Sequence, residues 1–293
     1  MPSVKDLRDR IRSLKNTQQI TKAMKQVAAA KIRRAEVAQK QARPYADTLA
    51  EMLRDLMNAV TNVDHPFMKP GNETAPMGVI LMTADKGLAG AFNSNVIRAG
   101  ELFARQQKDV AWYTVGIKAR NAVRRMGASN RPTWVLNAPS KIDVAREVAK
   151  QVTDDFVSGK ISGITLISSK LISMMSQKPE TRQMVPILRD TLAQAQSDAA
   201  EQHGPNGSVE FAPSPEFVLS RLLPKYLEFT IFSAMLETDA AFFAAQLLAM
   251  NNATDNAGKL IDGLTIQMNN ARQAAITKEL LEIVGGAEAL VNG

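Results

Sequence analysis

The sequence predicts a Rossmann-like α/β domain set between two long helices that pair as an antiparallel coiled coil. Apolar residues recur every three or four positions at both ends of the 293-residue chain, which is the spacing of one helical face. Between these ends, short apolar runs alternate with helical patterns, as in a mostly parallel sheet covered by helices. Each terminal helix needs an apolar partner, and the simplest partner is the other terminal helix.

Residues 1–62 are predicted to form the first long helix. Its apolar residues step by three and four, with a one-residue slip in the middle. They are Val4, Leu7, Ile11 and Leu14 before the slip, and Ile20, Met24 and Val27 after it. We expect all of them on one buried face. Pro44 should kink this helix, because proline lacks the backbone N–H that continues the hydrogen bonding.

Residues 63–189 are predicted to form the central α/β domain. The predicted strands are 79–83, 110–115, 134–136 and 164–168, and the predicted helices are 95–106, 117–126 and 142–157. Because strands and helices alternate, parallel strands joined by crossover helices are expected.

Residues 190–215 are predicted to be a flexible link, because the breaker Gly204-Pro205-Asn206-Gly207 lies in a polar stretch there. Residues 216–293 are predicted to form the second long helix. Its apolar face repeats over more than three heptads, which is typical of a coiled coil. The face consists of Phe243, Leu247, Met250, Thr254, Ala257, Ile261, Leu264, Met268, Ala271 and Ala275, and after one slip Ile276, Leu280, Ile283, Ala287 and Leu290.

Composition excludes several classes of function. The chain has no cysteine, which excludes disulfides, a thiolate nucleophile and a Cys-ligated metal. The N-terminus carries Lys5, Asp6 and Arg8 where a signal peptide is apolar. No run is expected to approach the roughly 20 apolar residues of a membrane span. We therefore expect a soluble chain that reaches a membrane only through a partner.

The positive charge is concentrated at one end. Residues 1–43 hold twelve Lys or Arg and three Asp or Glu, a net charge of +9, whereas the whole chain carries +7. A basic helix indicates either a solvated face or an acidic partner. Nucleic acid is disfavoured, because residues 1–44 contain no aromatic side chain on which bases could stack.

No catalytic, cofactor-binding or metal site is predicted. Gly87-Leu88-Ala89-Gly90 follows a strand and precedes a helix, where a loop can hold phosphate, but it matches no full phosphate motif and a structural turn is favoured. His65 and His203 belong to no spaced metal motif. The acidic pair Asp154-Asp155 is expected to be solvated.

Four stretches resemble the gamma subunits of F-type ATP synthases. Residues 20–31, ITKAMKQVAAAK, resemble the first shaft helix of that family. Residues 83–93, TADKGLAGAFN, resemble its central loop. Residues 252–257, NATDNA, and 271–280, ARQAAITKEL, resemble its C-terminal helix. The likeness covers essentially the whole chain in the family's order.

The resemblance implies a non-catalytic rotor shaft that couples proton or other ion movement through a membrane ring to ATP synthesis or hydrolysis. The implied partners are the alpha and beta subunits, the epsilon subunit and the c-subunit ring. Implied contacts with beta subunits are Lys22, Met24, Lys25, Arg272, Gln273 and Thr277; Phe211 is implied near the ring. The implied location is the cytoplasmic face of the bacterial cell membrane, as a peripheral component.

This sequence departs from the family pattern at a few positions. The central loop has Ala89 where many members have Cys. Ala241, Phe242, Phe243 and Gln246 stand where the family often has Ser-Glu-His and a later Arg. Contacts of that acid and base are therefore not carried over.

Two other functions remain open at this stage. One is a nucleotide-binding enzyme built on the α/β domain, which predicts saturable nucleotide binding by the isolated chain. The other is a coiled-coil adaptor for nucleic acid, which predicts binding that weakens steeply with salt. Co-purification with nucleotide-binding partners would favour the rotor shaft over both.

Overall fold

The computed structural model describes residues 3–59, 65–128, 130–187 and 214–291. The chain forms two compact units, residues 1–28 with 247–293 and residues 29–246. We call them the terminal unit and the central unit and describe each by itself.

The central unit contains a five-stranded sheet. The strands are β1 (Met77–Met82), β2 (Val110–Val115), β3 (Asn130–Trp134), β4 (Ile164–Ser173) and β5 (Ser176–Val185). Their spatial order is β3-β2-β1-β4-β5. The first four strands are parallel and β5 is antiparallel to β4, so the predicted α/β class with a mostly parallel sheet is confirmed.

One strand was missed and another was placed too late in the chain. β5 was missed because it is an edge strand whose residues are largely polar and exposed, so it lacks the apolar run by which buried strands are recognised. β3 ends at Trp134, where the predicted strand begins. It carries only one large apolar residue, and its pairing with β2 is irregular.

Three helices cover the sheet: α2 (Phe92–Ala104), α3 (Ile117–Arg125) and α4 (Lys141–Val157). A 3₁₀ turn, η1, spans Pro66–Met68. α4 begins where the side chain of Ser140 accepts a hydrogen bond from the Asp143 backbone N–H, which satisfies a group that the first turn leaves open.

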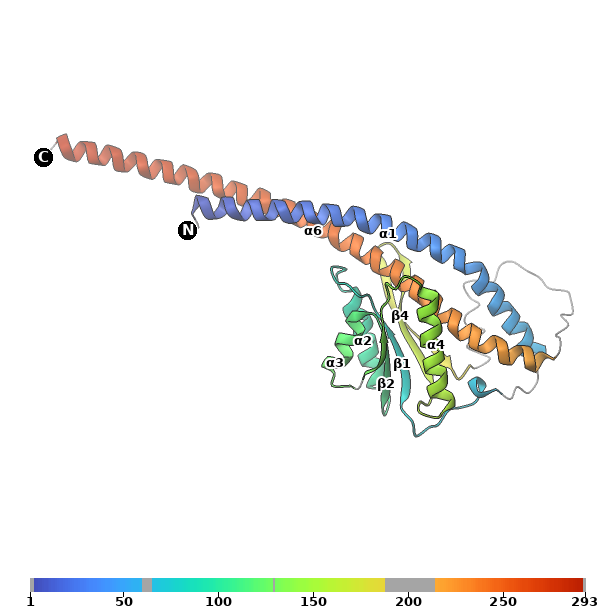
Figure 1. The fold of residues 1–293 in the computed structure, drawn as a ribbon. Helices are drawn as coiled ribbons and strands as arrows, with labels where there is room; N and C mark the ends of the chain where they lie inside the picture. The colour runs from blue at the N-terminus through green and yellow to red at the C-terminus, as the bar shows by residue number, and fades with distance from the viewer. Residues whose placement is uncertain (1–2, 60–64, 129, 188–213, 292–293) are drawn as a thin grey trace. The chain divides into compact units, whose positions relative to one another are not determined.

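Two long helices carry the ends of the chain. α1 spans Val4–Ala59 and α6 spans Pro215–Val291. Within the terminal unit the two helices run side by side in opposite directions (Figure 1), so the predicted antiparallel pair is confirmed. α1 continues through Pro44, so the proline does not break the helix.

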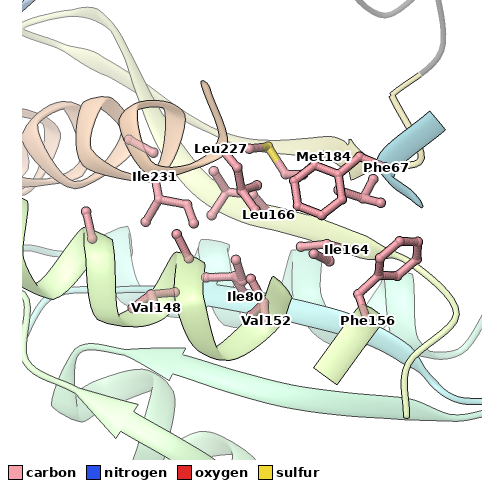
Figure 2. Close-up of a cluster of buried hydrophobic side chains, with 14 of the residues drawn as sticks. Phe67, Ile80, Val148, Val152, Phe156, Ile164, Leu166, Met184, Leu227 and Ile231 are labelled. Atoms are coloured by element: carbon pink, nitrogen blue, oxygen red, sulfur yellow. The ribbon is translucent and has the colours of Figure 1, made fainter. Parts of the chain in front are cut away.

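The main core lies between the sheet, α4 and α6. Figure 2 shows Leu227 and Ile231 of α6 facing Ile80 and Leu166 of the sheet, with Val148 of α4 beside them. Burying each such side chain stabilises the fold by about 1.5–3 kcal/mol. α6 is therefore a core element of the central unit as well as half of the helix pair.

The sheet buries both of its faces. Ile80 and Met82 of β1 belong to the core with α4 and α6, whereas Val79 and Leu81 pack in a second cluster with Val96 of α2. Successive strand residues point to opposite faces. This two-sided burial explains why β1 reads as a continuous apolar run.

α6 is also long and apolar enough, by length and composition, to pass as a membrane span between Glu216 and Gly285. The sequence expectation that no stretch meets this criterion was therefore wrong. However, 67% of the 18-residue window that meets this criterion is buried inside the protein. The core helix of a soluble protein can meet the same criterion of length and composition.

Candidate functional site: the helix pair and the loop that packs on it

The helix pair of the terminal unit has one continuous seam. Leu7, Ile11 and Ala28 of α1 are buried, as are Ala257 and Ile261 of α6. The predicted slip in α1 was wrong, because Ile20 is 61% exposed and Val27 is 54% exposed. The spacing of three and four instead continues through Gln18, Thr21 and Lys25 to Ala28. Because these three residues are polar, the apolar periodicity of the sequence does not reveal this part of the seam.

Hydrogen bonds connect the helices at these polar positions. Thr254 Oγ1 lies 2.8 Å from Thr21 Oγ1, and Lys25 Nζ donates to Asn251 Oδ1 at 2.6 Å. Gln18 Nε2 lies 3.4 Å from the backbone oxygen of Thr254. The Thr21 side chain is thus buried, at 8% exposure, with its hydroxyl satisfied. Buried hydroxyls of this kind are costly without a partner.

The contacts define the alignment of the two helices. Because Thr21 faces Thr254 and the helices run in opposite directions, Leu14 lies level with Ile261 and Leu7 with Met268. By the same count, Val4 at the start of α1 lies level with Ala271. α6 continues to Val291, so about 30 Å of helix extends beyond α1.

The extension leaves an apolar face uncovered. Ile276, Leu280 and Ile283 continue the predicted repeat, and each is at least half exposed. The prediction that they form part of the intrachain seam was wrong for a simple reason: α1 has already ended at this level.

The predicted contact residues fall into two groups on the helix pair. Lys22 and Lys25 are exposed and Met24 is half-buried on α1, whereas Arg272, Gln273 and Thr277 are exposed on the extension of α6. By the alignment above, Lys22 lies level with residue 253, about 30 Å from Arg272 along the axis. The structure therefore does not bring the two groups together. Phe211 lies outside the described residues.

The predicted glycine loop packs against both long helices inside the central unit. Leu88 and Gly90 have φ values of 63° and 56°, the left-handed region that makes a tight turn. Between them Ala89 is buried in a cluster with Phe92 and Phe242. The cluster consists of Ile32, Ala35, Ala84, Ala89, Phe92 and residues 240–245. This packing supports a structural turn rather than a phosphate-binding loop.

Asp85 joins three loops at the carboxyl edge of the sheet. Its side chain accepts hydrogen bonds from the backbone N–H groups of Ile117, Leu136 and Asn137 at 3.1, 3.3 and 2.8 Å. The first of these is a helix N-terminus, the group that a phosphate would need. A carboxylate of the chain thus takes that role at α3. Asp85 was not predicted as a site residue, although it lies just after an apolar strand, where such residues often occur.

The family is decided by comparison with known proteins. A family model described as ATP synthase matches residues 3–290. The ATP synthase gamma chain of Heliobacterium modesticaldum is 42% identical over 291 residues, which cover 99% of this chain and 100% of the relative. That of Phenylobacterium zucineum is 39% identical over 296 residues, with the same coverage. The chain belongs to the ATP synthase gamma family.

The fold agrees with this membership. A chain in the Euglena gracilis mitochondrial ATP synthase structure of the OSCP, F1 and c-ring assembly matches with a TM-score of 0.69 and 18% identity, over 98% of this chain and 94% of the other. A chain in the Tetrahymena thermophila central stalk and c-ring structure matches with a TM-score of 0.59 and 21% identity. At 18% and 21% sequence identity, these two matches support the fold alone. The family predicted from the four stretches is confirmed by the gamma chains of about 40% identity.

This gamma-family chain uses its departures from the family pattern for packing. Phe242 and Phe243 are buried, with ring centroids 5.2 Å apart, and Phe242 lies 5.7 Å from Phe92. Lys31 Nζ lies 5.1 Å from the centroid of the Phe243 ring, a favourable cation–π arrangement. Aromatic contacts therefore occupy the two positions, 242 and 243, where the family often has Glu and His.

The central unit also holds acids that are buried, Asp155 and Asp239, or half-buried, Glu237. Asp155 is 2% exposed and accepts hydrogen bonds from the Tyr113 hydroxyl at 2.7 Å and the Lys160 ammonium at 3.2 Å. The expectation that Asp155 is solvated was wrong, because these partners replace water. On α6, burial raises the pKa of both Glu237 and Asp239.

His65 has a structural contact. Its Nδ1 accepts the Phe67 backbone N–H at 3.1 Å at the start of η1, and burial lowers the pKa of the imidazole. His203 lies outside the described residues. In the part of the chain that the structure describes, no three His, Cys, Asp or Glu side chains gather as metal ligands.

Proposed function

We propose that this chain is the central shaft of an F-type ATP synthase, a non-catalytic subunit that couples ion movement to ATP synthesis or hydrolysis on other subunits. The observation that carries the proposal is the helix pair: α6 extends about 30 Å beyond α1, in a chain that matches gamma chains from end to end. A paired shaft with a single-helix tip suits a part that turns inside a ring.

The proposal assigns a role to each segment. Residues 1–62 and 216–293 form the shaft, residues 63–189 form a domain outside the ring, and residues 190–215 link the domain to α6. The partners are the alpha and beta subunits around the shaft, and the epsilon subunit and c-subunit ring near the domain. The complex is membrane-associated, and we place this chain on the cytoplasmic face of a bacterial membrane as a peripheral component.

Two sets of contacts transmit force in this proposal. Lys22, with Met24 and Lys25 beside it, faces acidic loops of the beta subunits; exposed charge pairs are individually weak, about 0–1 kcal/mol, so they break and reform as the shaft turns. Arg272, Gln273 and Thr277 make directed hydrogen bonds with beta-subunit loops. Phe211 is assigned to the region near the c-ring.

The test is reconstitution of the chain with its alpha and beta subunits and the membrane sector. Replacing Arg272 and Gln273 by Leu should impair ATP-driven proton pumping or assembly strongly. Neutralising Lys22 and Lys25 together should leave assembly intact and weaken coupling modestly. Equal, negligible effects of both double variants on rotation and pumping would refute this division of roles.

A separate measurement distinguishes the shaft from a nucleotide-binding enzyme. The isolated chain should hydrolyse no ATP and bind no nucleotide saturably. ATP turnover by the pure chain that Gly87→Val abolishes would overturn the proposal, because it would place an active site on the glycine loop. Salt-sensitive binding of DNA or RNA would instead support an adaptor.

A further inference from the structure

We propose that Gln18, Thr21 and Lys25 of α1, with Asn251 and Thr254 of α6, fix the axial register of the helix pair. We call these five residues the polar interval. In this role Lys25 is a positioning residue that holds the helices in alignment, while Lys22 remains the freely presented charge. The register is a property of the chain itself, and its consequence for the contact groups rests on the proposed function.

The apolar part of the seam specifies the register weakly. Its α6 side consists of Leu247, Met250, Ala257, Ile261, Leu264, Met268 and Ala271. A slip of one heptad would bring Leu14 from Ile261 to Met268, which exchanges one apolar contact for another. Apolar burial is non-directional, so such a slip loses little.

The polar interval responds differently to a slip. Its hydrogen bonds need donors and acceptors at fixed levels: Thr21 with Thr254, and Lys25 with Asn251. A slip of one heptad would place Thr21 level with Ile261 or Leu247. Its hydroxyl would keep the bond within α1 to the Gln18 backbone oxygen, but it would lose its partner across the seam. Buried polar residues in a coiled-coil seam are known to select register at some cost in stability.

A close approach of the helices supports the same assignment. A Cβ at Gly258 would lie 3.2 Å from Gln18 Nε2, so the absence of a side chain there leaves room for Gln18. From this position Gln18 reaches the Thr254 backbone oxygen. Among the described residues of the terminal unit, the side-chain hydrogen bonds between α1 and α6 all belong to the polar interval.

Register matters because each helix carries one of the two contact groups. A slip of one heptad would move Lys22 relative to Arg272 by about 10 Å along the axis. Two groups that act on a surrounding ring at different heights require a constant separation. The polar interval supplies it.

The experiment measures this separation in the full chain, which has no native cysteine. Spin labels at Ile20→Cys and Ile276→Cys, both on exposed positions, report one distance by pulsed electron resonance. The seam variant carries Thr21→Val, Thr254→Val, Lys25→Met and Asn251→Leu. The matched control carries Thr17→Val, Thr265→Val, Lys22→Met and Asn252→Leu, since Thr17 and Thr265 bond only within their own helices in the described contacts.

We expect a single distance in the parent chain and in the control. In the seam variant we expect an additional population displaced by about 10 Å, amounting to about a tenth of the molecules or more. A single unshifted distance in the seam variant would overturn the proposal, and so would an equal displaced population in the control. If the full seam variant is not helical by circular dichroism, Thr21→Val with Thr254→Val is compared with Thr21→Ser and Thr254→Ser, and only the valine pair should show the displaced population.

Discussion

The Lys141 ammonium and the Asp239 carboxylate form an ion pair that joins the start of α4 to α6, with 3.3 Å between Nζ and Oδ2. The two side chains are only 17% and 12% exposed. Lys31 also lies close enough to lower the pKa of Asp239, whereas Asp85 raises it, but burial is the largest effect and the pKa is raised overall. The pair therefore joins α4 to α6. Because burial disfavours the ionised carboxylate, the free-energy cost of this contact depends on whether Asp239 is protonated.

The free energy of unfolding should depend on pH in a way that reflects the raised pKa of Asp239. Because the folded-state pKa lies above the unfolded value of 3.8, the folded state binds the proton more tightly. The resulting stabilisation is complete below the unfolded pKa and is lost as the pH rises through the raised folded pKa. Asp239→Asn should remove this loss. Urea unfolding of both proteins at pH values upward from about 4 would measure it.

The matched control is Asp262→Asn, an exposed acid on the same helix. Its difference in unfolding free energy from the parent chain should stay constant over this range. Identical pH slopes for the parent chain and Asp239→Asn would contradict the prediction.

Phe92→Ala should destabilise the central unit by about 3–5 kcal/mol, because it leaves a cavity in a buried aromatic cluster. The ring packs edge-on against Phe242 at the point where the glycine loop contacts the long helices. Leu102→Ala on the same helix, at an exposed position, should change stability by less than about 0.5 kcal/mol. Chemical denaturation measures both, and equal effects would argue against this packing role.

Gly116→Ala and Gly263→Ala should have opposite effects. Gly116 has φ of 98°, and a Cβ there would lie 2.0 Å from the Thr83 backbone oxygen, so alanine forces the loop after β2 to move. A Cβ at Gly263, within α6, meets nothing within 4 Å. Alanine there should stabilise the helix by about 1 kcal/mol. Thermal unfolding followed by circular dichroism should show a lower midpoint for the first variant and a higher one for the second.

Asp85→Ala should cost more than about 3 kcal/mol, since it removes the shared acceptor of three backbone N–H groups. Asp143→Ala is the comparison, because Asp143 is exposed and its described side-chain partner is the neighbouring Arg146. Its expected cost is within about 1 kcal/mol. Hydrogen exchange at Ile117, Leu136 and Asn137 provides a local readout: faster exchange should be confined to the Asp85 variant.

Particular residues explain where prediction succeeded and failed. The seam of α6 from Phe243 to Ala271 was predicted because its repeat is almost entirely apolar. The matching seam of α1 was misassigned around Ile20 because Gln18, Thr21 and Lys25 are seam residues only when Asn251 and Thr254 stand opposite them. β5 escaped recognition because an exposed edge strand owes its structure to pairing with β4.

By itself, the sequence determined the long helices, the parallel sheet and the family, because these depend on local periodicity and on motifs that a chain carries wherever it folds. Only the tertiary structure decided which face of α1 is buried, where α6 loses its partner, and that Asp85 and the long helices fill the carboxyl edge of the sheet. These features depend on contacts between residues far apart in the chain. A polar side chain becomes an interior residue only when a distant partner satisfies its hydrogen bonds.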